Sequence, residues 1–294
     1  MKSVKMCLFV FYCAFLAALV FCSCAKSVKA VAPPNNKLKV SVTFNALAEM
    51  ARAVGGEYAE ILTIIPDGME VHDFELRVQD MKALGGADIL VYNGFGLETW
   101  VPEAITASGN EKLIAMDTSK GAEQIGTDPH LWLSVKGAQI QTRNIANAFA
   151  LVDPAHAAMF TKNADAFNAD LDALYAEYAK KIDAAPSKII VTGHAAFGYL
   201  CRDFGLTQNS VEDVFATGEP SPQQLASLIE FARTKKVKTI FAEKMVSPAI
   251  SQTLAAEIGA KVVAIYTMES AEDDKSYIER MRYNLEAIYQ SLIE

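Results

Sequence analysis

Apolar and polar positions follow a pattern that repeats along most of the chain. Residues 38–44 alternate apolar and polar side chains and run into a helical segment that begins at Asn45, which is the pattern of a strand followed by a helix. Strands that alternate with helices predict a mostly parallel sheet. Further strands are expected at 61–65, 88–92, 112–116, 188–192, 239–242 and 261–266, and further helices at 79–84, 222–235, 248–258 and 276–293.

One segment near the middle of the chain has a different pattern. From Pro154 to Ala185 the large apolar residues are spaced by threes, fours and sevens, with no internal glycine and no further proline. Asp153 is the expected N-cap of this helix, and Pro186 marks its end. A helix of that length would reach about 45–50 Å, more than one lobe needs. The predicted fold class is therefore α/β, with two Rossmann-like lobes of mostly parallel sheets joined by one long connecting helix.

The start of the chain carries a targeting pattern. Lys2 and Lys5 precede an apolar run over residues 6–22, which is typical of a signal peptide, although an uncleaved anchor helix is an alternative for a run of this length. A small residue precedes Cys24 and a polar stretch follows it, as in a bacterial lipoprotein cleavage site, with Cys22 as a competing position. The predicted division is a signal peptide at 1–23, a lipidated linker at 24–37, an N-terminal lobe at 38–153, the connecting helix at 154–185 and a C-terminal lobe at 186–294.

Composition narrows the classes of partner. The 294 residues are 51% hydrophobic and 21% charged, enough for two compact lobes. The net charge of −8 becomes −10 without Lys2 and Lys5. An acidic chain is not expected to bind nucleic acid, and its charge favours the approach of cations only weakly.

Cysteine usage predicts no disulfide. Three of the five cysteines lie in the predicted signal peptide, and acylation of Cys24 would leave Cys201 without a partner. The core must then hold the fold without covalent cross-links. Cys201 lies in an apolar stretch, so it is expected to be a small buried residue rather than a nucleophile.

Three of the four histidines are placed where an α/β fold gathers ligands. His72 and His194 each follow a predicted strand, and His130 stands in Thr-Asp-Pro-His. Ligands bind beyond the carboxyl ends of the strands in such sheets, and Glu269 follows the strand at 261–266. Imidazole nitrogens with one carboxylate suit Zn²⁺ and neighbouring divalent ions. These residues are too far apart in the sequence to form a local motif. The fourth histidine, His156, lies in the first turn of the long helix and is expected to be solvated.

The sequences around these histidines match known motifs. They are Pro-Asp-Gly-Met-Glu-Val-His-Asp-Phe-Glu at 66–75, Asp-Pro-His-Leu-Trp-Leu-Ser at 128–134 and Thr-Gly-His-Ala-Ala-Phe-Gly-Tyr at 192–199, with further matches at 219–225, 241–243 and 281–285. In this order they resemble the cluster A-I metal-binding lipoproteins of zinc and manganese ABC importers. The resemblance covers about residues 38–294.

The resemblance implies a ligand set. It assigns His72, His130 and His194 to the metal, together with an acidic residue near 268–274. Glu269 is the preferred fourth ligand, but the common form of the motif has an aspartate directly after the threonine, where this chain has Met268. Asp273 and Asp274 therefore remain alternatives. A histidine at the third position favours zinc over manganese, and the ion would be a transported ligand.

The resemblance also implies a function without catalysis. The protein is expected to be a monomer, held outside the cytoplasm by lipid on Cys24, at the cell surface or in the periplasm, that captures a metal between its lobes and delivers it to an ABC permease. The alternative is a secreted zinc-dependent hydrolase, which would keep one coordination position for water; the chain has no His-Glu-x-x-His or Gly-x-Ser-x-Gly motif. Histidines bind metal when neutral, so affinity is expected to fall below about pH 6.5. Glu243 follows a strand and is either a hydrogen-bond partner of a ligand histidine or a structural residue.

Overall fold

The computed structural model describes residues 37–215, 221–243, 248–271 and 273–294. The predicted signal peptide and the lipidation site at Cys24 lie outside these residues. Within the described ranges, no helix has the length and apolar composition needed to cross a membrane.

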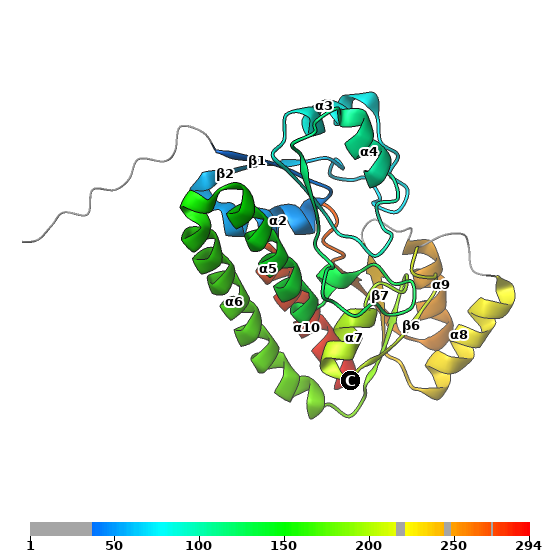
Figure 1. The fold of residues 1–294 in the computed structure, drawn as a ribbon. Helices are drawn as coiled ribbons and strands as arrows, with labels where there is room; N and C mark the ends of the chain where they lie inside the picture. The colour runs from blue at the N-terminus through cyan, green and yellow to red at the C-terminus, as the bar shows by residue number, and fades with distance from the viewer. Residues whose placement is uncertain (1–36, 216–220, 244–247, 272) are drawn as a thin grey trace, which may run out of the picture. The chain divides into compact units, whose positions relative to one another are not determined.

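Two four-stranded parallel sheets form the framework (Figure 1). The first has the order β2-β1-β3-β4 and the second the order β6-β5-β7-β8, so the two sheets share one strand order. The predicted fold class is confirmed. The strands are β1 (Leu38–Val42), β2 (Ala59–Thr63), β3 (Ile89–Tyr92), β4 (Ile114–Asp117), β5 (Ile189–Thr192), β6 (Thr207–Ser210), β7 (Thr239–Glu243) and β8 (Lys261–Ile265).

Helices connect these strands and cover the sheets. Those that were predicted begin and end within a few residues of their expected positions, whereas α4, α5 and α7 were not expected. The α-helices are α2 (Asn45–Gly55), α3 (Val78–Gly85), α4 (Val101–Ser108), α5 (Val135–Val152), α6 (Ala157–Asp183), α7 (Gly198–Phe204), α8 (Pro222–Thr234), α9 (Pro248–Ile258) and α10 (Tyr277–Leu292). Three short 3₁₀ turns are η1 (Gly56–Tyr58), η2 (Leu131–Leu133) and η3 (Pro154–His156).

The start of the long helix differs from the prediction. The segment from Pro154 begins as the 3₁₀ turn η3, and the α-helix α6 follows it. Asp153 makes no side-chain cap to the backbone, because its carboxylate lies 2.6 Å from Nδ1 of His156. The ring of His156 lies 4.3 Å from that of Tyr58, and the residue is half-buried, so the predicted solvation of this histidine is only partial.

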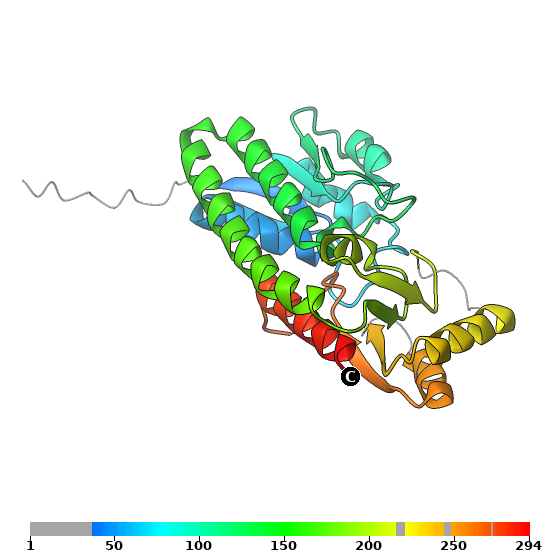
Figure 2. The same ribbon diagram turned by 90° about the horizontal axis from the view of Figure 1, so that it is seen from below.

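Helix α6 contacts both halves of the chain. It packs along α5 and α2, which come after strands of the first sheet in the chain (Figures 1 and 2). It also packs along α10, which comes after β8, the last strand of the second sheet. One hydrophobic core runs through both halves and includes Phe149, Leu171 and Met281. A separate, smaller core, which includes Val191 and Leu254, lies between the second sheet and helices α8 and α9. The two sheets are therefore joined by continuous apolar packing.

Candidate metal centre

Four residues from distant parts of the sequence meet beyond the strand ends. One possible ligand atom from each of His72, His130, His194 and Glu269 lies within 4.8 Å of all the others. His72 stands in the loop after β2, His130 in the loop after β4, His194 just after β5 and Glu269 just after β8. The carboxyl ends of parallel strands deliver these loops to one place. The structure thus brings together all four residues that the sequence singled out.

The imidazole nitrogens have the spacing of a coordination shell. Nε2 of His130 lies 3.0 Å from Nε2 of His72 and 3.3 Å from Nε2 of His194. Tetrahedral nitrogen ligands at a bond length of about 2.1 Å stand roughly 3.4 Å apart. The three rings therefore point the same nitrogen at one shared position.

A carboxylate stands behind each of the two buried imidazoles. Asp128 Oδ1 lies 2.8 Å from Nδ1 of His130 and accepts a 2.9 Å hydrogen bond from the backbone N–H of His130. Glu243 Oε1 lies 3.4 Å from Nδ1 of His194 and accepts a 3.2 Å bond from its backbone N–H. A partner on Nδ1 fixes the ring and directs Nε2 toward a metal. Of the two interpretations of Glu243, the geometry supports the hydrogen-bond partner of a candidate ligand histidine. The contact of Asp128 with His130 was not predicted, although both residues stand in the Asp-Pro-His motif.

Two glycines make room for these carboxylates. A Cβ at Gly193 would lie 1.9 Å from Oε2 of Glu243, and a Cβ at Gly198 would lie 2.6 Å from Oδ2 of Asp128. Both distances are far below van der Waals contact. A side chain at either glycine would displace the carboxylate that orients the histidine.

Burial keeps two of the three imidazoles neutral. It lowers the pKa of His72 to about 3, helped by the charges that His130 and His194 would carry. Burial, with His194, also lowers the pKa of His130 well below its usual range. Burial acts to lower the pKa of His194 as well, but the carboxylates of Glu243, Glu70 and Glu212 together outweigh it, and the net shift is upward. Neutral imidazole is the form that binds a metal ion.

Apolar side chains wall one side of the cluster. The Trp132 ring lies 5.0 Å from that of His130 and is fully buried, and the Phe215 ring lies 5.8 Å from that of His72. Trp132 Nε1 donates a 2.7 Å hydrogen bond to the carbonyl of Thr267, two residues before Glu269. Trp132 therefore serves both as core and as a link between two ligand loops.

The alternative fourth ligands point elsewhere or stand outside the cluster. The Asp273 carboxylate contacts Arg280, Lys275 and Tyr266. Among the described residues, the group of possible ligands contains Glu269 and neither Asp273 nor Asp274. The geometry therefore favours Glu269 over both aspartates.

Comparison with known proteins decides the family. The family model described as "ZnuA: Zinc-uptake complex component A periplasmic" matches residues 40–291. The chain belongs to this family. As a ZnuA-family protein it is the metal-binding, substrate-binding component of a zinc or manganese ABC uptake system. Members of the family are transport proteins and not enzymes, which excludes the hydrolase alternative.

Individual relatives span nearly the same length as this ZnuA-family chain. It is 41% identical over 300 residues to a putative metal-binding protein of Treponema pallidum, with 95% of each chain covered. It is 34% identical over 285 residues to the high-affinity zinc uptake system protein ZnuA of Bacillus subtilis, with 88% of each covered. The crystal structure of the Streptococcus pneumoniae AdcAII protein is similar with a TM-score of 0.83 at 31% identity, covering 88% of this chain and all of that one.

Proposed function

We propose that His72, His130, His194 and Glu269 together hold one divalent ion as transported cargo, and that this ion is zinc. The observation that carries the proposal is the convergence of their ligand atoms within 4.8 Å, with carboxylates behind two of the imidazoles. Four protein ligands complete a tetrahedral shell and leave no position for an activated water. Such a site captures an ion and does not act on a substrate.

The donor set supports zinc over manganese. Three imidazole nitrogens and one carboxylate oxygen form a nitrogen-rich site, for which zinc has a higher intrinsic affinity than manganese. Manganese favours sites with more oxygen ligands. Manganese is the alternative cargo.

The proposed division of labour follows the two sheets. The N-terminal lobe, 38–153, supplies His72 and His130, and the C-terminal lobe, 186–294, supplies His194 and Glu269, with the helix at 154–185 between them. The shared hydrophobic core and the contacts of α6 with α5, α2 and α10 oppose a wide opening of the lobes. Release to the permease would then proceed by small rotations and local loop movement.

The remaining features of the proposal concern attachment. The mature chain would begin at Cys24, carry lipid there, and stand as a monomer on the outer side of a membrane, beside its ABC permease. It would not bind nucleic acid. The family is described as periplasmic, which supports this placement.

Metal content tests the proposal directly. Untagged residues 25–294 would be purified and analysed by inductively coupled plasma mass spectrometry, beside His194→Ala and a matched control, His156→Ala. His156 lies outside the cluster, against Tyr58. One zinc per chain in the wild type and in the control, lost in His194→Ala, is the expected result. No metal in the wild type after exposure to zinc would refute the proposal.

A further inference from the structure

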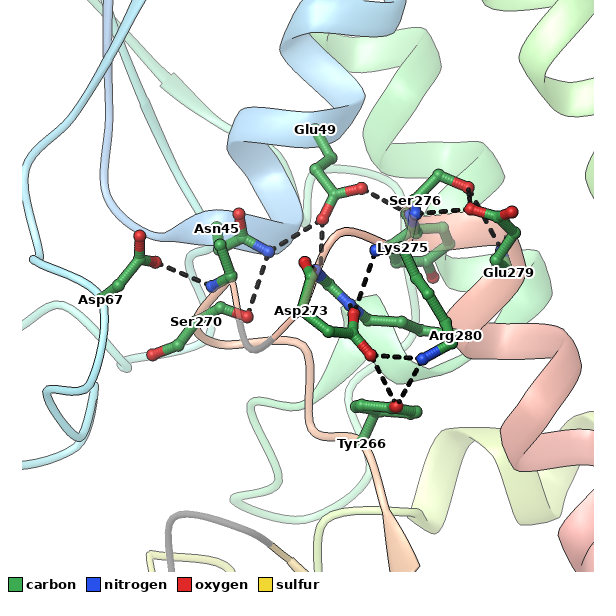
Figure 3. A network of polar contacts seen from close by, with 12 residues as sticks. Asn45, Glu49, Asp67, Tyr266, Ser270, Asp273, Lys275, Ser276, Glu279 and Arg280 are labelled. Carbon is green, nitrogen blue, oxygen red and sulfur yellow. Dashed lines mark hydrogen bonds and ion pairs between the residues drawn. The ribbon is translucent and has the colours of Figure 1, made fainter.

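The loop that carries Glu269 is tied to the first half of the chain at Glu269 and at the two residues that follow it. The backbone N–H of Asn45, at the start of α2, donates a 3.1 Å hydrogen bond to the carbonyl of Glu269 itself, and its side-chain amide donates one of 3.3 Å to the carbonyl of Ser270. The Ser270 hydroxyl accepts from the backbone of Gly68, and the backbone of Ala271 donates to the carboxylate of Asp67. Figure 3 shows the contact between Asn45 and Ser270 beside a second group of charged side chains.

Arg280 of α10 stands at the centre of that second group, with 1% of its surface exposed. Its Nη1 lies 2.8 Å from Oε1 of Glu49 on α2. On the other side, Nε lies 3.1 Å from Oδ1 of Asp273, and Nη2 donates a 3.0 Å bond to the Asp273 carbonyl. The Asp273 carboxylate also accepts from the hydroxyl of Tyr266 and pairs with Lys275 (Figure 3). We refer to Glu49, Arg280 and Asp273 as the triad.

The triad and the ligand loop form one closed set of contacts. Asn45, which holds the Glu269 carbonyl, also donates a 2.8 Å hydrogen bond to Oε1 of Glu49. From Glu49 the contacts run through Arg280 to Asp273, four residues after Glu269 in the same loop. The loop is therefore held at Glu269 and again, four residues later, at Asp273.

The backbone beside Glu269 needs such support. Met268 has a φ of 61° and is fully buried, a conformation that L-residues other than glycine rarely adopt. Such a strained conformation persists only where the surroundings hold it. A loop released from the triad would lose the contacts that oppose relaxation at this residue.

We propose that the triad Glu49–Arg280–Asp273 positions Glu269 for metal binding. The inference rests on the proposed function and deepens it, because it names the groups that set the fourth ligand without touching the ion. A buried ion pair is by itself weak support for stability. Here one carboxylate partner of Arg280 lies on α2, whose Asn45 holds the Glu269 carbonyl, and the other lies in the loop of Glu269. The triad therefore ties the ligand loop to α2.

Zinc affinity, measured by competition with a fluorescent chelator, tests the triad. Arg280→Gln and the milder Glu49→Gln are each expected to weaken zinc binding on the order of 10-fold, the loss typical when a group that orients a ligand is removed. The matched control is Arg282→Gln: Arg282 is on the same helix and pairs with Glu177 of α6, and its affinity is expected to equal that of the wild type. Glu49→Gln carries the test if Arg280→Gln does not fold.

A double mutant separates positioning from general destabilisation. If the triad acts through Glu269, then Glu49→Gln has no further effect on zinc affinity in a Glu269→Ala background. Independent, additive losses would overturn the inference, as would equal affinities in the wild type and both triad variants. A wild-type chain that binds no zinc gives a separate result, because it refutes the proposed function before any variant is compared.

Discussion

The four candidate ligands differ in how they are supported. His130 and His194 are almost fully buried, and each has a carboxylate behind its ring. His72 is partly exposed, and Glu269 stands on a loop that is held by backbone contacts and by the triad. His130 and His194 are therefore oriented by immediate neighbours within the core, whereas the Glu269 loop is held by contacts that cross between the two halves, and His72 is the most exposed of the four. We expect a movement of one half against the other to disturb the Glu269 loop before the two buried imidazoles.

The largest effect is expected from removing a core histidine. His130→Ala should reduce zinc affinity by more than the roughly 10- to 100-fold typical for a supporting partner, because Nε2 of His130 faces both other imidazoles. His72→Ala should lose less zinc affinity, because water can reach the partly exposed position that the imidazole leaves. Chelator competition on both variants checks the order. Equal losses would remove the distinction between the two pairs.

A smaller effect is expected from the carboxylate behind His130. Asp128→Asn should weaken zinc binding about 10- to 100-fold, since the amide orients the ring less strongly than a carboxylate does. Asp153→Asn is the matched control, because Asp153 stands behind His156 in the same way, away from the site. An unchanged affinity in Asp128→Asn would show that the core alone orients His130.

Glu98, a buried acid linked through Asn93 to the loop of His130, should make the free energy of unfolding depend on pH. Burial raises the pKa of Glu98 to about 7, against hydrogen bonds from Asn93 and Thr43, and Asn93 in turn donates to the carbonyl of Pro129. The folded state then binds this proton more tightly than the unfolded chain, so the stabilisation is full below about pH 4.5 and is lost as the pH rises through about 7. The stabilisation lost through Glu98 is about 3 kcal/mol.

Denaturant unfolding of the metal-free protein measures that dependence. Between pH 5 and pH 8, Glu98→Gln should show a flatter decline in the free energy of unfolding than the wild type, because glutamine does not titrate. Parallel curves for the two proteins would place the proton elsewhere.

The smallest effect is expected at the link between the two pairs. Trp132→Phe removes the hydrogen bond to the carbonyl of Thr267 and should lower the free energy of unfolding by about 1–2 kcal/mol, with only a few-fold loss of zinc affinity. Trp100→Phe is the control, because Trp100 packs against Phe74 and lies outside the cluster. A loss of affinity as large as that of Asp128→Asn would mean that Trp132 orients a ligand.

Periodicity predicted most of the fold, and its failures have physical reasons. Strand β6 was not expected because Thr-Gln-Asn-Ser at 207–210 is a short polar strand at the edge of its sheet, with no apolar alternation. Helix α5 was not expected, and its first turn contains Gly137, where a Cβ would lie 2.2 Å from the Leu131 carbonyl oxygen. That glycine is required by close packing, which a single sequence does not reveal.

The candidate site could be predicted only in part for a similar reason. The three candidate histidines stand in recognisable motifs, whereas Glu269 departs from the common form of its motif and was separated from Asp273 and Asp274 only by the geometry. The triad is different, because Glu49 and Arg280 are 231 positions apart and each is an ordinary charged residue on an amphipathic helix. Only the fold brings them to the ligand loop.

The shared strand order of the two sheets affects how the site can be altered. The loops after β4 and β8, the fourth strands of the two sheets, supply His130 and Glu269 from equivalent places. One offers a borderline nitrogen donor and the other a hard oxygen donor. A substitution of the donor residue in one of these two loops would change the hardness of the site and leave both sheets intact. The preference for one ion over another can therefore vary without a change in the fold.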